Sequence, residues 1–561
     1  MDNPAAKKHL FSPPCRLSAG DKDFAMSQNV CTFAAQKRHN MEKIATAVTV
    51  FNSWVWSPAL VGLCLLAGLY FSLRTRFVQV RRFGEMFRLL FIGDKAKAHG
   101  GKKTGISSFQ AFAMALSGRV GTGNIVGVAT AIGFGGPGAI VWMWIIAFFG
   151  AGSAFVEATL AQIYKEDHNG QFRGGPAYYI EKGLHSPFFG SLFAVLAAVA
   201  CGVFLPPIHG NSIALSCSET FGVAPWVVGA VVATLLALVV MGGVKRIANV
   251  AQVVAPVMAM VYIILAVVVL AVNWQVVPDV LMQMLRGAVG VNEVGGALLG
   301  STIAWGVKRG IYSNEAGQGT GAIVAAAAKV SHPVKQGLVQ AFSVYIDTLL
   351  VCTATAMMIL ACKTYNIIDS VTVNGGTATV SYLLQNPGAP EGEPGVFYTT
   401  GALGTVIGPR AGHTVISIAL FFFAFTTVMA YYYYAETNLV YLFNRWRRRV
   451  YKKHPERLDE LEEADLKFGD DRGERVVIWL LRISTVAAVF ISSLQTSGFV
   501  WTLGDIGVGV MAWINVVAIL LLSPKALRSL KDYERQKKQG VEPKFDPKAL
   551  GIEGVEYWIT Q

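Results

Sequence analysis

Long apolar runs recur along the chain, and short polar segments separate them. A transmembrane helix needs about 20 apolar residues, and each run reaches roughly that length. The runs lie at residues 51–73 and at about 107–133, 137–164, 187–207, 223–242, 247–272, 295–330, 336–362, 412–435, 475–495 and 501–523. The pattern predicts an all-α polytopic membrane protein with about 11 spans in the lipid bilayer.

Glycines interrupt the run at 107–133, which reads GRVGTGNIVGVATAIGFGGPG from Gly118 to Gly138. Each glycine inside a helix costs roughly 1 kcal/mol relative to alanine, so a plain lipid anchor is not expected to carry so many. Unwound backbone is tolerated in a bilayer where it packs in protein or lines a wet cavity. The candidate site is therefore Gly121, Thr122, Gly123 and Asn124. Close packing through small residues is the alternative explanation.

The run at 295–330 is interrupted too, by polar and glycine residues. These are Lys308, Arg309, Gly310, Tyr312, Ser313, Asn314, Glu315, Gly317, Gln318 and Gly319. Ionisable groups within a span usually face a cavity or one another. Glu315 is expected to contact an ion or substrate. The alternatives are that it pairs with Lys308 or Arg309, or that it accepts hydrogen bonds from freed N–H groups. Together with Asn314, it is assigned a coupling or structural role at this second interruption.

The two interrupted runs are the first and sixth of the ten that follow residues 51–73. Matching interruptions in two halves indicate an inverted-repeat transporter with its site near the bilayer midplane. The expected organisation is a disordered extension (1–40), an extra transmembrane helix with a cytoplasmic amphipathic segment (41–104), two five-helix repeats (105–272 and 273–524) and a cytoplasmic tail (525–561). The turn-rich segment 363–411 is expected to form a partly ordered outer lid.

The composition agrees with a membrane protein. Hydrophobic residues make up 53% of the chain and charged residues only 15%, against about 25% charged in soluble domains. The net charge of +13 comes from lysines and arginines in the loops. When the spans are counted from the N-terminus, these loops all fall on the same side of the membrane. The charge therefore agrees with the positive-inside rule and does not indicate a nucleic-acid partner. This orientation places the N-terminus outside and the C-terminus in the cytoplasm.

Other chemistry is not indicated. The seven cysteines include no CxxC pair, which argues against a zinc site and a disulfide framework. No Walker motif and no nucleophile with its base is found, so neither an enzyme nor a cofactor is expected. Nothing marks an oligomer interface, and a monomer would suffice.

Four segments resemble the alanine or glycine:cation symporters, and the resemblance extends from about Met41 to Pro524. They are GTGNIVGVATAIGFGGPGAIVWMW (121–144), FVEATLAQIY (155–164), SNEAGQGT (313–320) and KQGLVQAFSVYIDTLLVCTATA (335–356). The resemblance implies a leucine-transporter-type 5+5 inverted repeat with one extra N-terminal helix. It also implies sodium-driven import of small neutral amino acids across a bacterial inner membrane.

The sodium ion is expected between the first interruption and a pair of hydroxyls. Thr426 and Thr427 are adjacent in an apolar run, and their oxygens together with the carbonyls of Gly118 and Gly121 suit a hard cation. In the fold implied by the resemblance, the sodium site joins these same elements. Alternatively, the threonines bond to carbonyls one turn back in their own helix.

The amino acid is expected at the two interruptions. Half-helix N-termini attract a carboxylate, and carbonyls attract an ammonium group. The backbone from Gly121 to Asn124 is assigned the first role, and carbonyls near Tyr312 and Ser313 the second. Asp347 is expected to pair inside the bundle, with contact to the ion path as the lesser alternative.

Three positions depart from the pattern of the family. His209, Tyr312 and Tyr431 stand where members usually carry glutamine, phenylalanine and tryptophan. The corresponding positions line the family's substrate pocket, so the changes suggest a more polar or differently shaped compartment and put alanine itself in doubt. For His209, a place at the outer mouth is the alternative. Proton coupling through Glu315 or His209, and a uniporter or channel for a small polar solute, are the rival functions.

Overall fold

The computed structural model describes residues 43, 46–91, 105–168, 170–291, 295–374, 377–392, 394–453, 472–495 and 497–559. The expected disordered extension (1–40) lies outside these residues. By internal contacts the chain divides into two compact units, Met1–Trp54 and Val55–Gln561. The described residues 46–54 of the first unit are helical. All elements from α2 onward belong to the second unit.

Helices dominate the second unit, and many of them begin with proline in the first turn, where its missing N–H is not needed. The first group is α2 (Pro58–Arg74), α3 (Val78–Arg81), α4 (Phe83–Phe91), α5 (Ser108–Arg119), η1 (Gly123–Gly127), α6 (Val128–Gly135), α7 (Ala139–Ile163), α8 (Pro176–Gly183), α9 (Pro187–Val199), η2 (Ala200–Phe204), α10 (Leu205–Phe221), α11 (Pro225–Val240), α12 (Gly243–Val272), η3 (Trp274–Val276) and α13 (Val277–Ala288).

The second group begins with the other interrupted run. It comprises α14 (Gly295–Asn314), α15 (Thr320–Ala327), α16 (Pro333–Val344), η4 (Tyr345–Cys352), α17 (Thr353–Ala361), α18 (Val396–Ile407), α19 (Pro409–Lys453), α21 (Arg472–Ser492) and α22 (Ser497–Lys538). Both predicted interruptions are present, because α5 and α6 are separate helices and so are α14 and α15.

Eight helices among the described residues are long and apolar enough to cross a membrane. They are Thr46–Arg74, Ala139–Ile163, Pro187–Phe221, Gly243–Val272, Pro333–Ala361, Pro409–Val450, Gly473–Ser492 and Ser497–Lys538. Shorter apolar helices occur at Gly123–Gly135, Pro225–Val240 and Val396–Ile407. The chain is therefore a multi-pass membrane protein. Part of the difference from the predicted 11 spans arises because an interruption leaves two short helices in place of one long one.

Three predicted span ends were wrong. The helix from Pro187 continues to Phe221 instead of ending at residue 207, and the helices that begin at Pro409 and Ser497 reach Lys453 and Lys538. In the first case the apolar run stops at polar residues that the bundle buries, such as His209 and Asn211. Hydropathy thus marks where a helix meets lipid, and it does not mark where the helix ends.

The structure also contains two antiparallel hairpins, which an all-α prediction omits. One joins β1 (Glu166–His168) to β2 (Gln171–Arg173), with Glu166 opposite Arg173. The other joins β3 (Asn366–Asn374) to β4 (Thr377–Gln385) within the expected lid segment. Tyr365 and Ile367 of that segment are buried in one cluster with residues of α6 and α7.

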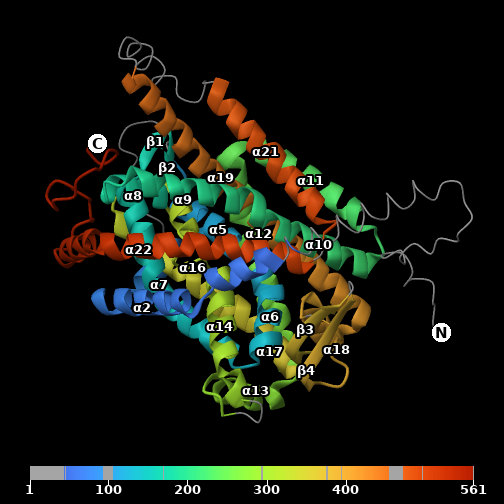
Figure 1. The fold of residues 1–561 in the computed structure, drawn as a ribbon. Coiled ribbons are helices and arrows are strands. Elements are labelled where there is room, and N and C mark those ends of the chain that lie inside the picture. The colour runs from blue at the N-terminus through green and yellow to red at the C-terminus, as the bar shows by residue number, and fades with distance from the viewer. Residues whose placement is uncertain are drawn as a thin grey trace, which may run out of the picture. The chain divides into compact units, whose positions relative to one another are not determined.

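Small residues allow close packing around α7, which contacts α14 and α16 (Figure 1). A Cβ on Gly337 of α16 would lie 2.8 Å from the carbonyl oxygen of Phe155, and one on Gly306 of α14 would lie 2.5 Å from that of Ala139. Helices in lipid associate through such small-residue contacts, which let their backbones approach closely. This packing brings the two interruptions to the same buried region.

Candidate functional site between the two interrupted helices

The first interruption follows α5, whose last residue is Arg119. Val120 is extended (φ −77°, ψ 91°), and the chain then enters the π-helical turn η1. The side chain of Asn124 bridges the gap, because its Oδ1 accepts a hydrogen bond of 2.8 Å from the N–H of Gly121. Residues 121–124 are all buried. Only Val120 and Gly121 are non-helical, since Thr122 is helical and Gly123 and Asn124 belong to η1. The predicted unwinding of residues 121–124 was therefore wrong beyond Gly121, and the short break is packed in protein and held by Asn124.

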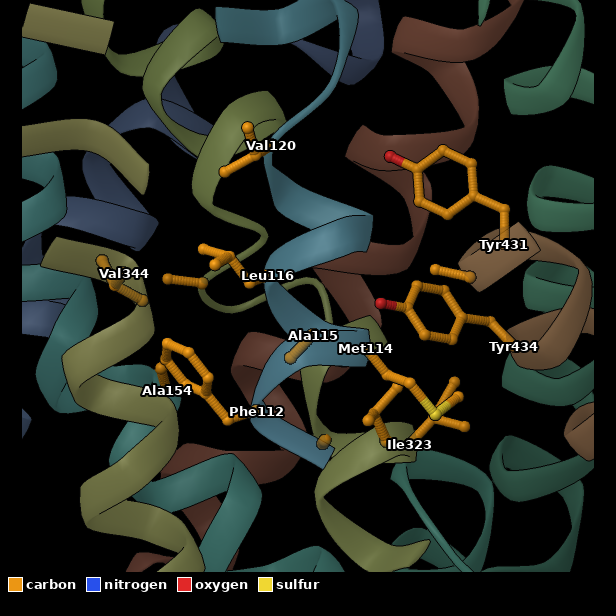
Figure 2. Close-up of a cluster of buried hydrophobic side chains, with 14 of the residues drawn as sticks. Phe112, Met114, Ala115, Leu116, Val120, Ala154, Ile323, Val344, Tyr431 and Tyr434 are labelled. Carbon is orange, nitrogen blue, oxygen red and sulfur yellow. The ribbon is translucent and has the colours of Figure 1, made fainter. Parts of the chain in front are cut away.

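Two glycines beside this interruption leave room for side chains of α19. A Cβ on Gly121 would lie 2.4 Å from Thr427 Oγ1, and one on Gly118 would lie 2.3 Å from Tyr434 Oη. Figure 2 shows Tyr434 and Tyr431 pointing toward α5. The glycines thus serve the close approach of polar atoms as well as the helix break.

The second interruption begins at Glu315, which has a positive φ of 56°. Asn515 of α22 donates hydrogen bonds of 2.9 Å to the carbonyl of Gly317 and to Glu157 Oε2 of α7. Asn314 Oδ1 accepts one of 3.0 Å from the N–H of Ala316. Three elements therefore fix this unwound segment through side-chain hydrogen bonds.

The expected pairing of Glu315 with Lys308 or Arg309 was wrong. Both cations lie inside α14 and pair with Asp505 of α22, at 2.6 Å for Lys308 Nζ and 2.9 Å for Arg309 Nη1. Glu315 instead places Oε2 3.4 Å from Tyr434 Oη. The helix continues through Lys308 and Arg309 because Asp505 opposes their charges, so the interruption starts one to two turns later than the polar residues suggested.

Asp347 joins the two interrupted helices. Its carboxylate accepts hydrogen bonds from Asn124 Nδ2 (2.7 Å), Ser313 Oγ (2.8 Å) and its neighbour Thr348 Oγ1 (2.8 Å). It lies in the π-helical segment η4, and such segments are frequent at functional sites. Pairing of Asp347 inside the bundle was the main prediction, and contact with the ion path was the alternative. In the sequence, a role for Asp347 in the site was indicated by its position within an apolar run, next to the hydroxyl of Thr348.

The adjacent threonines of α19 differ in their contacts. Thr427 Oγ1 donates to the carbonyl of Ser117 at 2.8 Å, and the carbonyl of Val120 lies at 3.4 Å. Both carbonyls belong to the end of α5. The hydrogen bonds of Thr426 go to Phe422 and Phe423 in its own helix, at 3.0 Å each. Thr427 also makes the local bond of the alternative explanation, to the carbonyl of Phe423 at 2.9 Å. The two threonines therefore differ in that Thr427 additionally contacts the end of α5.

The three residues that depart from the family pattern lie around the first interruption. His209 is buried, with Nδ1 3.2 Å from Thr122 Oγ1, and its ring centre is 5.4 Å from that of Tyr431. The ring of Tyr312 lies 3.1 Å from the position of a Cβ on Gly123. His209 therefore lies beside the unwound segment and not in a loop at the mouth of the bundle.

The convergent groups are carbonyls, hydroxyls, amides and one carboxylate. Oxygen ligands of this kind suit a hard cation. Among the described residues, no lysine, arginine or histidine forms an ion pair with the carboxylate of Asp347, which suits a positively charged group. No group of three or more histidine, cysteine, aspartate or glutamate side chains that could hold a metal ion was found in the described part of the chain.

Comparison with known proteins identifies the family. A sequence model described as the sodium:alanine symporter family matches residues 41–454 and 463–547. YrbD of Bacillus subtilis (strain 168) is 48% identical over 515 residues, which cover 92% of this chain and 98% of YrbD.

Two further relatives carry names that differ in the amino acid. The sodium/proton-dependent alanine carrier protein of Bacillus sp. (strain PS3) is 43% identical over 474 residues, covering 84% of this chain and 97% of the relative. The B. subtilis protein called probable sodium/glutamine symporter GlnT is 38% identical over 513 residues, covering 91% and 95%.

These matches extend over most of the chain and nearly the whole of each relative. They confirm the resemblance seen in the sequence motifs. The protein is a transporter that couples amino-acid movement to a cation, and it is not an enzyme. The chain belongs to the sodium:alanine symporter family.

Proposed function

We propose that this protein imports a small neutral amino acid together with sodium by alternating access. The observation that carries the proposal is the contact of Thr427 Oγ1 with the carbonyl of Ser117 in the last turn of α5, which ends just before the first interruption. A cation held by these oxygens would bind α19 to the end of α5. The bound sodium would then stabilise the shape of residues 121–124 that receives the amino acid.

The sodium ligands are assigned to Thr427 and to backbone carbonyls between Ser117 and Gly121, including those of Gly118 and Gly121. The contact of Thr427 with Ser117 and Val120 supports this assignment. Thr426 is retained as a weaker candidate, since its hydroxyl bonds within its own helix. Binding of sodium and binding of amino acid should strengthen each other by the same factor, because the coupling free energy is reciprocal.

The amino acid is assigned to the space between the two interruptions. The N–H of Gly121 is engaged by Asn124, so the N–H groups of Thr122 and Gly123 are the donors proposed for the carboxylate. The ammonium group is assigned to carbonyls near Tyr312 and Ser313 and to the carboxylate of Asp347. The hydrogen bond from Ser313 to Asp347 supports this grouping.

The side chain of the amino acid is assigned to the compartment around His209, Tyr312 and Tyr431. The contact between His209 and Thr122 supports a polar compartment. A neutral side chain with a hydrogen-bonding group, such as an amide, would fit it better than a methyl group alone. The names of two relatives, an alanine carrier and a probable glutamine symporter, include one amino acid with a methyl side chain and one with an amide side chain.

The proposed architecture is the 5+5 inverted repeat, with its halves at 105–272 and 273–524 after the extra helix of 41–104 and before the tail of 525–561. The proposed location is a bacterial inner membrane, with the N-terminus outside and the C-terminus in the cytoplasm. Sodium entering with a zwitterion carries net positive charge, so the membrane potential would drive uptake by about 2.3 kcal/mol per charge per 100 mV.

Proton coupling is the second candidate, because the name of the strain PS3 relative includes both sodium and proton. Glu315 is the carboxyl assigned to that mechanism, since it is buried between the interruption and Tyr434. Asn314 is assigned a structural role, which its hydrogen bond to Ala316 supports.

The test is uptake of radiolabelled alanine, glycine, serine and glutamine into proteoliposomes, with an inward gradient of sodium or of protons. Thr427→Ala is expected to reduce sodium-driven uptake about tenfold or more, since one hydrogen-bonding ligand is worth about 1.5 kcal/mol. Thr426→Ala tests the weaker candidate and is expected to reduce sodium-driven uptake less than Thr427→Ala does. Uptake that follows protons and ignores sodium would overturn the sodium assignment, and Glu315→Gln would then be the decisive variant.

A further inference from the structure

Lys165 lies just beyond the end of α7 and is fully buried. Its Nζ donates to Gln162 Oε1 at 2.8 Å and to the carbonyl of Ala328 at 2.9 Å. Three aromatic rings surround the ammonium group, with centres 4.3 Å away for Phe172, 4.5 Å for Tyr557 and 5.1 Å for Trp558. Burial lowers the pKa of Lys165. Ring faces and carbonyls replace the water that a buried ammonium group has lost.

The carbonyl of Ala328 follows the last residue of α15, the short helix after the second interruption. Carbonyls at a helix C-terminus carry partial negative charge and attract a cation. Gln162 Nε2 also donates to Ala328 at 2.9 Å and to Ala325. Lys165 and Gln162 therefore fasten the end of α15 to α7.

The chain just before α5 is fastened at the same place. Ile106 forms a parallel bridge with Ala328, with hydrogen bonds from Lys329 N–H to Ile106 O (2.9 Å) and from Ile106 N–H to Ala327 O (3.1 Å). The start of α5 and the end of α15, which lie away from the two interruptions, thus meet beside Lys165. In the proposed transport cycle, these two ends must separate before the substrate can leave on this face of the bundle.

The C-terminal segment after α22 covers this junction, and Figure 1 shows it returning toward α8 and β2. Trp558 Nε1 donates to the carbonyl of Gln162 at 2.9 Å, and Glu556 pairs with Lys182 at 2.8 Å. Near α16, the N–H of Phe545 donates to the carbonyl of Ser331 at 3.2 Å. The buried side chains of the C-terminal segment include Phe545, Ile552, Val555 and Tyr557.

We propose that Lys165, Phe172 and the C-terminal residues Tyr557 and Trp558 form a latch that keeps the ends of α5 and α15 together, and that opening toward this face requires its release. Lys165 is then a positioning residue for transport, and the C-terminal segment is the part that detaches. The inference rests on the proposed alternating-access cycle, but not on the identity of its ion or amino acid.

The test reports opening directly, with no sodium or amino acid present. Ile323 of α15 is buried in the cluster of Figure 2, near Met114 of α5, and cysteine fits in its place because it is smaller. Ile323→Cys in the full chain serves as the reporter. Its reaction with a membrane-impermeant maleimide on the C-terminal face is measured, after subtraction of the reaction of the chain without the added cysteine.

Trp558→Ala is expected to raise the labelling rate about fivefold, the change in an equilibrium that about 1 kcal/mol produces. Trp558→Phe should restore much of the difference, because it keeps a ring beside Lys165. Lys165→Met should also raise the rate. Trp446→Ala is the matched control, since Trp446 is an exposed tryptophan of α19 and its removal should leave labelling unchanged.

Unchanged labelling in both Trp558→Ala and Lys165→Met would overturn the latch. A rise in Lys165→Met alone would overturn the role of the C-terminal segment. Failure of sodium-driven uptake would leave these labelling results intact, so the two proposals fail separately.

Discussion

Asp347 and Asp505 are both buried in the bundle, and their partners differ. Asp505 accepts two cations, Lys308 and Arg309, on the neighbouring α14. Asp347 accepts hydrogen bonds from the neutral groups of Asn124, Ser313 and Thr348. In the described part of the chain, no lysine, arginine or histidine pairs directly with Asp347.

The difference separates a structural cluster from a candidate site. A buried charge is costly unless it is paired. Asp505 is neutralised within the protein, and its cluster carries a surplus positive charge that lies over the faces of Trp305 and Trp501. Asp347 is solvated by hydrogen bonds but lacks an opposite charge in direct contact. We therefore expect a ligand with positive charge to interact with Asp347 and not with Asp505.

The largest effect is expected for Asp505→Asn. It would leave Lys308 and Arg309 buried without an opposing charge, and removal of one partner of a buried ion pair costs about 3–5 kcal/mol. The measurement is thermal unfolding of the purified protein in detergent. Lys308→Gln is the matched control, because it leaves a neutral pair of Arg309 and Asp505 and should change the unfolding temperature much less. Equal shifts in both variants would contradict the account of this cluster.

Asp347→Asn is expected to act on transport more than on stability. The amide keeps one acceptor oxygen for the neighbouring donors but removes the negative charge offered to the ligand. Uptake should fall about 100-fold, as for a charge pair worth about 2–3 kcal/mol, while the unfolding temperature changes little. If Asp347→Asn behaves as Asp505→Asn does, with large unfolding and no specific transport defect, the contrast between the two aspartates fails.

The smallest effect is expected for His209→Gln, which replaces one neutral polar group beside Thr122 with another. Folding and sodium dependence should be retained. The ratio of glutamine to alanine uptake should change by about 10-fold or less, since one neutral hydrogen bond is worth about 0.5–1.5 kcal/mol. An unchanged ratio across the amino-acid panel would show that His209 does not contact the substrate side chain.

Much of the fold was predictable because hydropathy and glycine content act locally. The apolar runs predicted the multi-pass membrane class, and the two interruptions were found where glycines and polar residues concentrate. The ends of the long helices were not predictable in this way, since His209 and Asn211 are polar but face the interior of the bundle. The β1–β2 hairpin was missed because its strands have only three residues each. The strands of β3–β4 have nine residues each, and this hairpin was missed because the segment 363–411 was interpreted only as a turn-rich lid.

The site was predictable only in part. Glycines 118 and 121 and the threonine pair stood out by residue type, but only the packing of α19 against α5 distinguished Thr427 from Thr426. The partners of Lys308, Arg309 and Asp347 lie on helices distant in sequence. Local pattern does not contain that information, and an ion-pair assignment by proximity along the chain consequently failed for Glu315.

The sequence by itself determined that the chain is a polytopic membrane transporter of this family, with two unwound segments inside apolar helices. The apolar spans and the unwound segments follow from the cost of burying polar backbone and charge in lipid. That cost depends on the type of each residue and of its neighbours in the sequence. The tertiary structure decided which buried charges neutralise one another and which remain for a ligand. That decision depends on distances of a few ångströms between helices, because the energy of a charge in a bilayer depends on its immediate partners.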